Sequence, residues 1–219
     1  MAFSFPRSIA GGFMTEPIFN KRIFTLSTFA ASARDLFAHL DELHTALTQH
    51  RISHAFSEKI MLAVTQVNGC RYCSYAHTRL ALQAGVTEPE LRDLFMGEFS
   101  HIPEHELIAV LFAQHYAEQA DRYDAATWQS LIETYGAEVA SDILTHIRVI
   151  TFANLYGNTF DALLERLQFH PVRGSHFFDE VIVLSAGATV VPIGLFLGMF
   201  ARRLSAAVFQ RRDLRAHHD

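Results

Sequence analysis

The stretch that most constrains this chain is Asn68-Gly69, followed by Cys70 and Cys73, the only two cysteines in the sequence. Asn-Gly is typical of a helix end, so we expect one helix to stop here and another to begin at the cysteines. In that new helix, Cys70, Cys73 and His77 are spaced by three, four and seven residues and lie on one face. The sequence therefore predicts two thiols and an imidazole stacked near a helix N-terminus.

This arrangement is suited to redox chemistry. A helix N-terminus stabilises a thiolate on Cys70, and a protonated His77 does the same for Cys73. Two neighbouring thiols with a base in reach can carry out thiol–disulfide exchange or react with a peroxide. Zinc binding is the alternative, but a tetrahedral site needs four ligands, and His77 and one distant residue would have to complete it. We therefore expect no metal and no cofactor.

Composition indicates a helical globular protein. The chain has 219 residues, half of them apolar and 19% charged, which is enough for one large or two small domains with a sizeable core. Glycine and proline are scarce before the C-terminal part, and alternating β-branched residues are nearly absent. The net charge of −5 gives no indication of nucleic-acid binding. The redox-spaced cysteines and the absence of an N-terminal secretory segment predict a cytoplasmic protein.

Apolar spacing predicts helices over residues 28–48, 107–120, 127–135 and 137–167. Ser57 is the expected cap of the helix that carries Glu58, where a lone glutamate usually complements the helix dipole. Thr87-Glu88-Pro89-Glu90 predicts another helix start. Within the last predicted helix we expect a break near Asn154–Asn158.

That break suggests an internal repeat, with residues 57–82 laid over residues 141–166. The alignment puts the two cysteines opposite Asn154 and Gly157, and the histidine opposite Asp161. The second half would then keep a helix–break–helix scaffold without the thiols. Chance alignment of two amphipathic helices is the alternative. We expect Asn154, Asn158 and Asp161 to be structural.

We divide the chain into an irregular N-terminal arm at residues 1–28, a helical domain at 29–168 and an apolar C-terminal helical extension at 177–212. The extension includes 20 uncharged residues, 181–200, with Gly194-x-x-x-Gly198 among them. This length is sufficient to cross a bilayer.

Two features argue against a membrane crossing by residues 181–200. Five arginines follow, so the positive-inside rule would keep that end in the cytoplasm and push the thiol domain across the membrane. Pro192, with Gly187 and Gly194 around it, also predicts a kink or a break. Burial in the core of a homo-oligomer and a hairpin that dips into the membrane both stay open.

Glu58, Cys70, Cys73 and His77 together spell E-x11-C-x2-C-x3-H. This pattern resembles the signature of the AhpD-like alkylhydroperoxidase and carboxymuconolactone decarboxylase superfamily, and the resemblance extends over about residues 34–167. It implies an all-α, AhpD-like helical bundle that forms oligomers. It also implies a peroxiredoxin-type thiol peroxidase or a disulfide reductase.

By the same resemblance, Cys73 attacks the peroxide, Cys70 closes the disulfide, and Glu58 and His77 form a proton relay. The implied partners are a small peroxide or disulfide substrate and a thiol reductant or redox partner protein. Tyr72 stands where the founding peroxidase has a histidine. The alternatives are a non-redox, carboxymuconolactone decarboxylase-like protein that binds small molecules or processes lactones, and an adaptor recruited to membranes by its tail.

Overall fold

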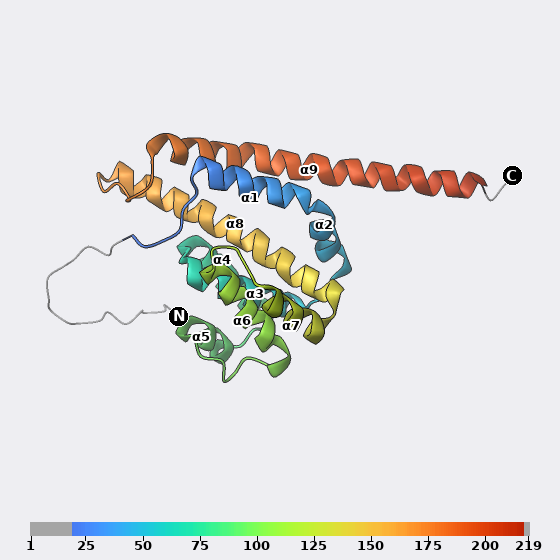
Figure 1. Cartoon of the computed structure of the whole chain (residues 1–219), viewed down its shortest axis with the longest axis horizontal. Coiled ribbons are helices and arrows are strands. Elements are labelled where there is room, and N and C mark those ends of the chain that lie inside the picture. Colours follow the sequence, from blue (N-terminus) through green and yellow to red (C-terminus); the bar gives the residue numbers. More distant parts are fainter. Residues whose placement is uncertain (1–18, 217–219) are drawn as a thin grey trace.

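The computed structural model describes residues 19–216, with side chains described up to residue 196. Every regular element in this range is an α-helix, which confirms the all-α class (Figure 1). In chain order the helices are α1 (Leu26–Ala38), α2 (Leu40–Gln49), α3 (His54–Asn68), α4 (Arg71–Gln83), α5 (Glu88–Met96), α6 (Glu104–Glu118), α7 (Ala125–Tyr135), α8 (Ala137–Leu167) and α9 (Phe177–Ala216).

The long helix α8 separates two apolar clusters. On one side it packs with α3, α6 and α7 around fully buried residues such as Ile60, Val110 and Ile147. On the other side it packs against α1 and α9 around Phe24, Leu155 and other apolar residues. Figure 1 shows the two layers on either side of α8. Because it carries apolar residues all round, α8 is the central element of the fold.

Two predictions about the first three helices differ from the structure. The helix expected at 28–48 is two helices, α1 and α2, which are separated at His39. The cap of α3 is Ser53, whose hydroxyl accepts a hydrogen bond from the Phe56 amide, and not Ser57. Ser57 lies inside the helix and donates its hydroxyl to the His54 carbonyl. Glu58 therefore lies in the second turn, beyond the reach of a simple dipole effect.

The break expected at Asn154–Asn158 is wrong, because α8 runs unbroken from Ala137 to Leu167. The side-chain amides of both asparagines have partners outside their own helix, on Thr65, Asn68 and Arg22. They therefore do not compete with the backbone bonds of α8. The helix–break–helix repeat is not found in the described part of the chain.

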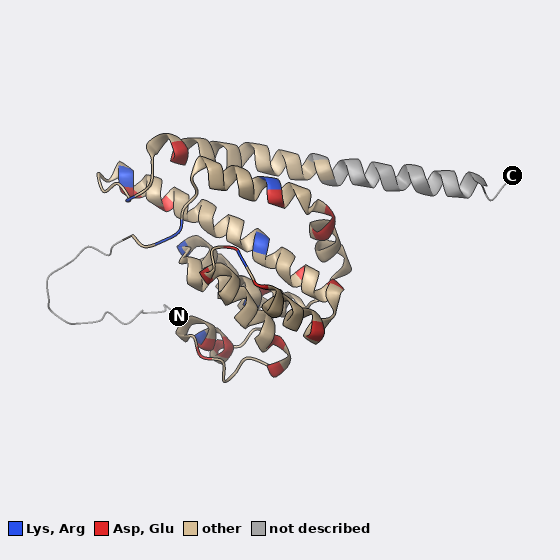
Figure 2. Cartoon of the chain, viewed as in Figure 1, with Lys and Arg blue, Asp and Glu red and all other residues tan. Residues whose placement is uncertain are grey.

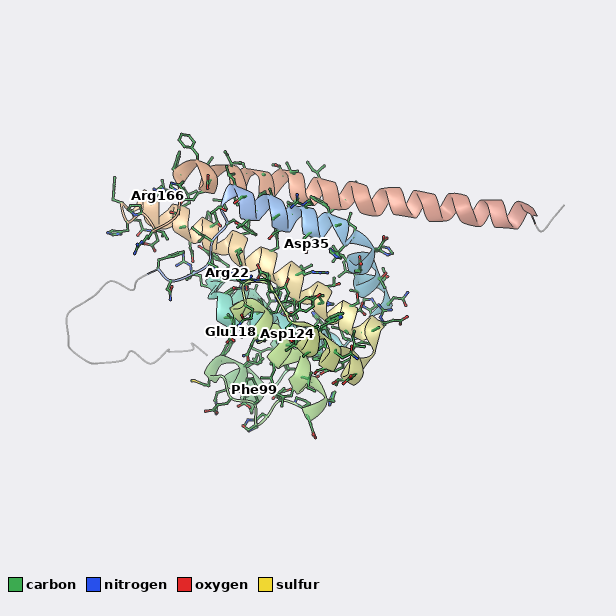
Figure 3. The ribbon with its side chains drawn as sticks, viewed as in Figure 1. Arg22, Asp35, Phe99, Glu118, Asp124 and Arg166 are labelled. Carbon is green, nitrogen blue, oxygen red and sulfur yellow. The ribbon has the colours of Figure 1, made fainter. Side chains whose placement is uncertain are left out.

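A kink or a break was expected near Pro192, and the break is not found, because α9 runs on through this residue. One of its faces packs along the chain's own body. A Cβ added at Gly187, Gly194 or Gly198 would lie within 2.3 to 2.7 Å of Tyr156, Phe37 or Leu40, respectively. Arg166, near the end of α8, holds the start of α9 through Glu180 at 2.8 Å (Figure 3).

The opposite face of α9 is apolar and exposed. Val190, Ile193 and Phe196 are 60%, 58% and 64% exposed. After its acidic first turn, α9 carries no charge over residues 181–196 (Figure 2). The segment Phe177–Phe196 is long and apolar enough to cross a membrane, although core helices of soluble proteins pass the same criterion.

The limits predicted for the three parts of the chain stay a prediction, and residues 1–18 of the arm lie outside the described residues.

Candidate functional site

The cysteines begin α4 as the sequence predicts. Gly69 ends α3 in the left-handed conformation, with φ of 68°, and Cys70 is the N-cap of α4. The Cys70 sulfur accepts a hydrogen bond from the backbone amide of Cys73 at 3.4 Å. A sulfur in this position replaces the oxygen of a usual capping residue and lies at the positive end of the helix dipole.

The two sulfurs lie 2.9 Å apart, close enough to share a proton but longer than a disulfide bond. The hydrogen bond with the Cys73 thiol lowers the pKa of Cys70 from 9.0 to about 7, with help from the backbone amides at the helix start. The same hydrogen bond raises the pKa of Cys73, and burial and the neighbouring charge act in the same direction. The first proton of the pair is therefore lost more readily than that of an ordinary thiol, and the shared hydrogen bond favours the negative charge on Cys70.

The structure brings Glu58 and His77 together, although they come from different helices. A Glu58 oxygen lies 2.7 Å from Nδ1 of His77, and the other oxygen lies 3.0 Å from Nε2 of His54. Glu58 is 2% exposed. A buried carboxylate on Nδ1 fixes the orientation of the His77 ring and leaves Nε2 free to exchange a proton. No hydrogen bond joins His77 to either sulfur among the described residues, so a proton must cross through water or substrate.

Sequence reasoning missed the contribution of α8 to this site. A Cβ built on Gly157 would lie 2.7 Å from the Cys70 sulfur, so only glycine leaves the sulfur its place. Asn154 is fully buried, and its side-chain hydrogen bond works to lower the pKa of Cys73. Asn154 itself is held by Thr65 at 3.1 Å and by Asn68 at 3.3 Å. Asn154 was expected to be only structural, and no role was predicted for Gly157; both lie against the thiols.

Asp161 completes this face of α8. Its carboxylate pairs with Lys21 at 2.8 Å and with Arg71 at 2.7 Å, and it is 4% exposed. The same arginine donates to the Tyr72 hydroxyl at 2.9 Å. The two cations offset the Asp161 charge, which on its own works to raise the pKa of Cys70.

A signal for this face was present in the sequence. Asn154, Gly157, Asn158 and Asp161 follow one another at i, i+3, i+4 and i+7, which puts a polar stripe on one side of a helix. A polar stripe on a helix that is otherwise apolar all round must be buried against polar partners. The alignment by repeat obscured this pattern because it placed a break in the same residues.

The geometry does not favour zinc. The described residues contain no cluster of three or more histidine, cysteine or acidic side chains that could hold a metal ion. The arrangement instead provides a dithiol, a shared proton, and a carboxylate–imidazole pair near it.

Comparison with known proteins gives one match. Residues 34–99 match the family model described as the carboxymuconolactone decarboxylase family. The matched range contains Glu58, both cysteines and His77, and it ends well before the residues of α8 that contact the thiols. No curated protein and no solved structure matches the chain.

Proposed function

Because residues 34–99 match the model of the carboxymuconolactone decarboxylase family, which includes AhpD-like proteins, we propose that the chain is a thiol-dependent oxidoreductase. Cys70 and Cys73 would cycle between dithiol and disulfide to reduce a peroxide. The observation that carries this proposal is the sulfur pair at 2.9 Å with the pKa of Cys70 lowered to about 7. A pair held this way is reactive at neutral pH and can close a disulfide with little movement.

Two observations support different tasks for the two cysteines. Cys70 carries the charge but is only 1% exposed, whereas Cys73 is partly exposed. We propose that Cys73 meets the peroxide and passes its proton to Cys70 as it attacks. The Cys73 sulfur bonds to one peroxide oxygen, the O–O bond breaks, and the other oxygen leaves as an alcohol after taking up a proton. Cys70 then displaces hydroxide from the sulfenic acid, which gives the disulfide and water.

Glu58 and His77 support the proton transfers. The leaving alkoxide needs a proton, and His77, oriented by Glu58 at 2.7 Å, can supply one through its free ring nitrogen. An external thiol must return two electrons to the disulfide to complete the cycle. A small thiol or a redox partner protein would fill this role.

The first experiment is mass spectrometry of the non-reduced protein after a stoichiometric amount of peroxide. We expect a loss of two hydrogens from the intact chain, with Cys70 and Cys73 linked. Cys70→Ser should instead accumulate a sulfenic acid on Cys73, which dimedone traps. Trapping on Cys70 in Cys73→Ser at the wild-type rate would reverse the two roles. Thiols that survive peroxide would favour the non-redox, small-molecule-binding alternative.

His77→Ala should slow disulfide formation by about tenfold or more, the range for losing a general acid or base. His54→Ala is the matched control, since His54 also contacts Glu58 at 3.0 Å but has a side chain that is 62% exposed. We expect the control to keep most of the rate in stopped-flow measurements. Equal rates for wild type and His77→Ala across neutral pH would remove His77 from the mechanism.

The exposed face of α9 supports assembly or membrane contact, which we propose as a second property. Deleting the tail is a poor test, because Val183 and Val191 are buried against the chain's own body. The double substitution Val190→Lys and Ile193→Lys leaves that packing intact and adds charge only to the exposed face of α9. We expect the double variant to lose self-association in sedimentation or to leave the membrane fraction of cells. Unchanged size and location would exclude both uses of this face.

A further inference from the structure

A cavity of about 270 Å³ lies between α1, α6 and α8, away from the cysteines. Neither thiol, nor Glu58, nor His77 contributes to its wall. Its polar groups are Ser32, Asp35, Tyr116, Asp121, Arg148 and Thr151. Apolar contacts are available on Leu36 and Phe152. The volume is slightly below the usual range for drug-sized ligands, so the cavity suits a smaller molecule.

Two polar atoms of the wall are buried without a hydrogen bond. Oγ1 of Thr151 has none, and Thr151 is 5% exposed, while Nε of Arg148 has only an ion pair with Asp35. The other buried threonines of α8 behave differently, since Thr145 and Thr159 each donate to the carbonyl four residues earlier, at 2.9 and 2.8 Å. A buried polar group with no partner is costly, so these two donors point to an acceptor that binds in the cavity.

The spacing of the two donors indicates the shape of the acceptor. Residues 148 and 151 are separated by three positions on one helix, so they lie on the same face. A carboxylate offers two oxygens, one for each donor, and pairs favourably with a guanidinium. Tyr116 adds a hydroxyl that stays protonated, because burial raises its pKa to about 12.

The carboxylate of Asp35 lies where the carboxylate of a ligand would pair with Arg148. One oxygen of its carboxylate forms an ion pair with Nε of Arg148 at 3.5 Å without a hydrogen bond, and its other oxygen lies 3.3 Å from His39. Its side chain is 46% exposed, so it can turn toward His39 when the cavity fills. The second acid of the wall, Asp121, is already held by both nitrogens of Arg22, at 2.9 and 2.6 Å (Figure 3).

We propose that this cavity binds a small monocarboxylate, with the carboxylate on Arg148 and Thr151 and a short apolar body against Leu36 and Phe152. The site is separate from the thiol pair and would bind its ligand in either redox state. Ligand binding would also displace Asp35 from Arg148, which ties the position of α1 to occupancy of the cavity.

Calorimetric titration of the full chain with benzoate tests the proposal. Benzamide, which has a similar shape and no charge, is the comparison probe. We expect saturable binding of benzoate at millimolar concentration and much weaker binding of benzamide. Arg148→Gln and Thr151→Val should each weaken benzoate binding by about tenfold, the range for a hydrogen bond to a charged group. Asp35→Asn should tighten it, since it removes the competing carboxylate.

Matched controls separate binding from damage to the fold. Thr145→Val makes the same change on the same helix at a hydroxyl that has a backbone partner, and Arg173→Gln removes a charge at an exposed site outside the cavity. Both should bind benzoate as wild type does. Equal affinity for the two probes, unchanged affinity in Thr151→Val, or weaker binding in Asp35→Asn would each overturn the proposal. So would the absence of saturable benzoate binding.

Discussion

Asparagine and glycine are neighbours both at the junction of α3 and α4 and in the middle of α8. The helix ends at the first place and continues through the second. At Asn68-Gly69 the glycine adopts φ of 68° and ends a helix. At Gly157-Asn158 the helix runs on. The two regions meet, because Nδ2 of Asn158 donates to the carbonyl of Asn68 at 2.8 Å. The unbroken helix thus satisfies an orphan carbonyl at the end of the broken one.

The difference shows that glycine has a separate task in each region. Gly69 is needed for its backbone conformation, and its neighbourhood has room, since an added Cβ would lie 3.6 Å from Lys21. Gly157 is needed for its missing side chain, since an added Cβ would lie 2.7 Å from the Cys70 sulfur, while its backbone is ordinary helix. One glycine creates the helix start that activates a thiol, and the other makes space for it.

The largest effect should come from the thiol that the helix start activates. The ultraviolet absorbance of the thiolate should rise with a midpoint at about pH 7, because the pKa of Cys70 is lowered from 9.0 to about 7. Alkylation should become faster as pH rises through this value and then level off. Cys70→Ser should abolish the step. A step that persists in Cys70→Ser would place the thiolate on Cys73 and break the comparison.

Gly157→Ala should have the next largest effect. Alanine improves helix propensity by about 1 kcal/mol, but crowding the Cys70 sulfur costs about 1–3 kcal/mol, so we expect a net loss of stability in urea unfolding. The same change in a Cys70→Ala background should instead stabilise the protein, because the crowded sulfur is gone. A loss of equal size in both backgrounds would contradict the steric role of Gly157.

Gly69→Ala should have the smallest effect, a loss of about 1 kcal/mol from the left-handed backbone conformation alone. Here the Cys70→Ala background should make no difference to the loss of stability in urea unfolding. Gly69→Asn should cost less than Gly69→Ala, since asparagine tolerates this conformation better. If the cost of Gly69→Ala depended on Cys70, the two glycines would share one task after all.

Local features of the sequence predicted the start of α4, its cysteines on one face, and the start of α5. Thr87 and Glu90 form a capping box within four residues, so no distant contact is needed to identify it. The cap of α3 was misplaced because Ser53 and Ser57 both precede helical sequence. Only the hydrogen bond from the Phe56 amide to the Ser53 hydroxyl identifies Ser53 as the cap. Asn154 and Gly157 could not be assigned, because their role depends on packing between segments far apart in the chain.

The packing of α8 against the thiols also has a consequence for the chain during its synthesis. Asn68 and its partners Asn154 and Asn158 are separated by 86 and 90 residues. A chain emerging from the ribosome therefore presents both cysteines long before the helix that covers them has been made. During that interval the pair can be oxidised or reduced by whatever it meets. When α8 finally docks, Gly157 adds no side chain beside the Cys70 sulfur, so the helix covers this thiol without displacing it.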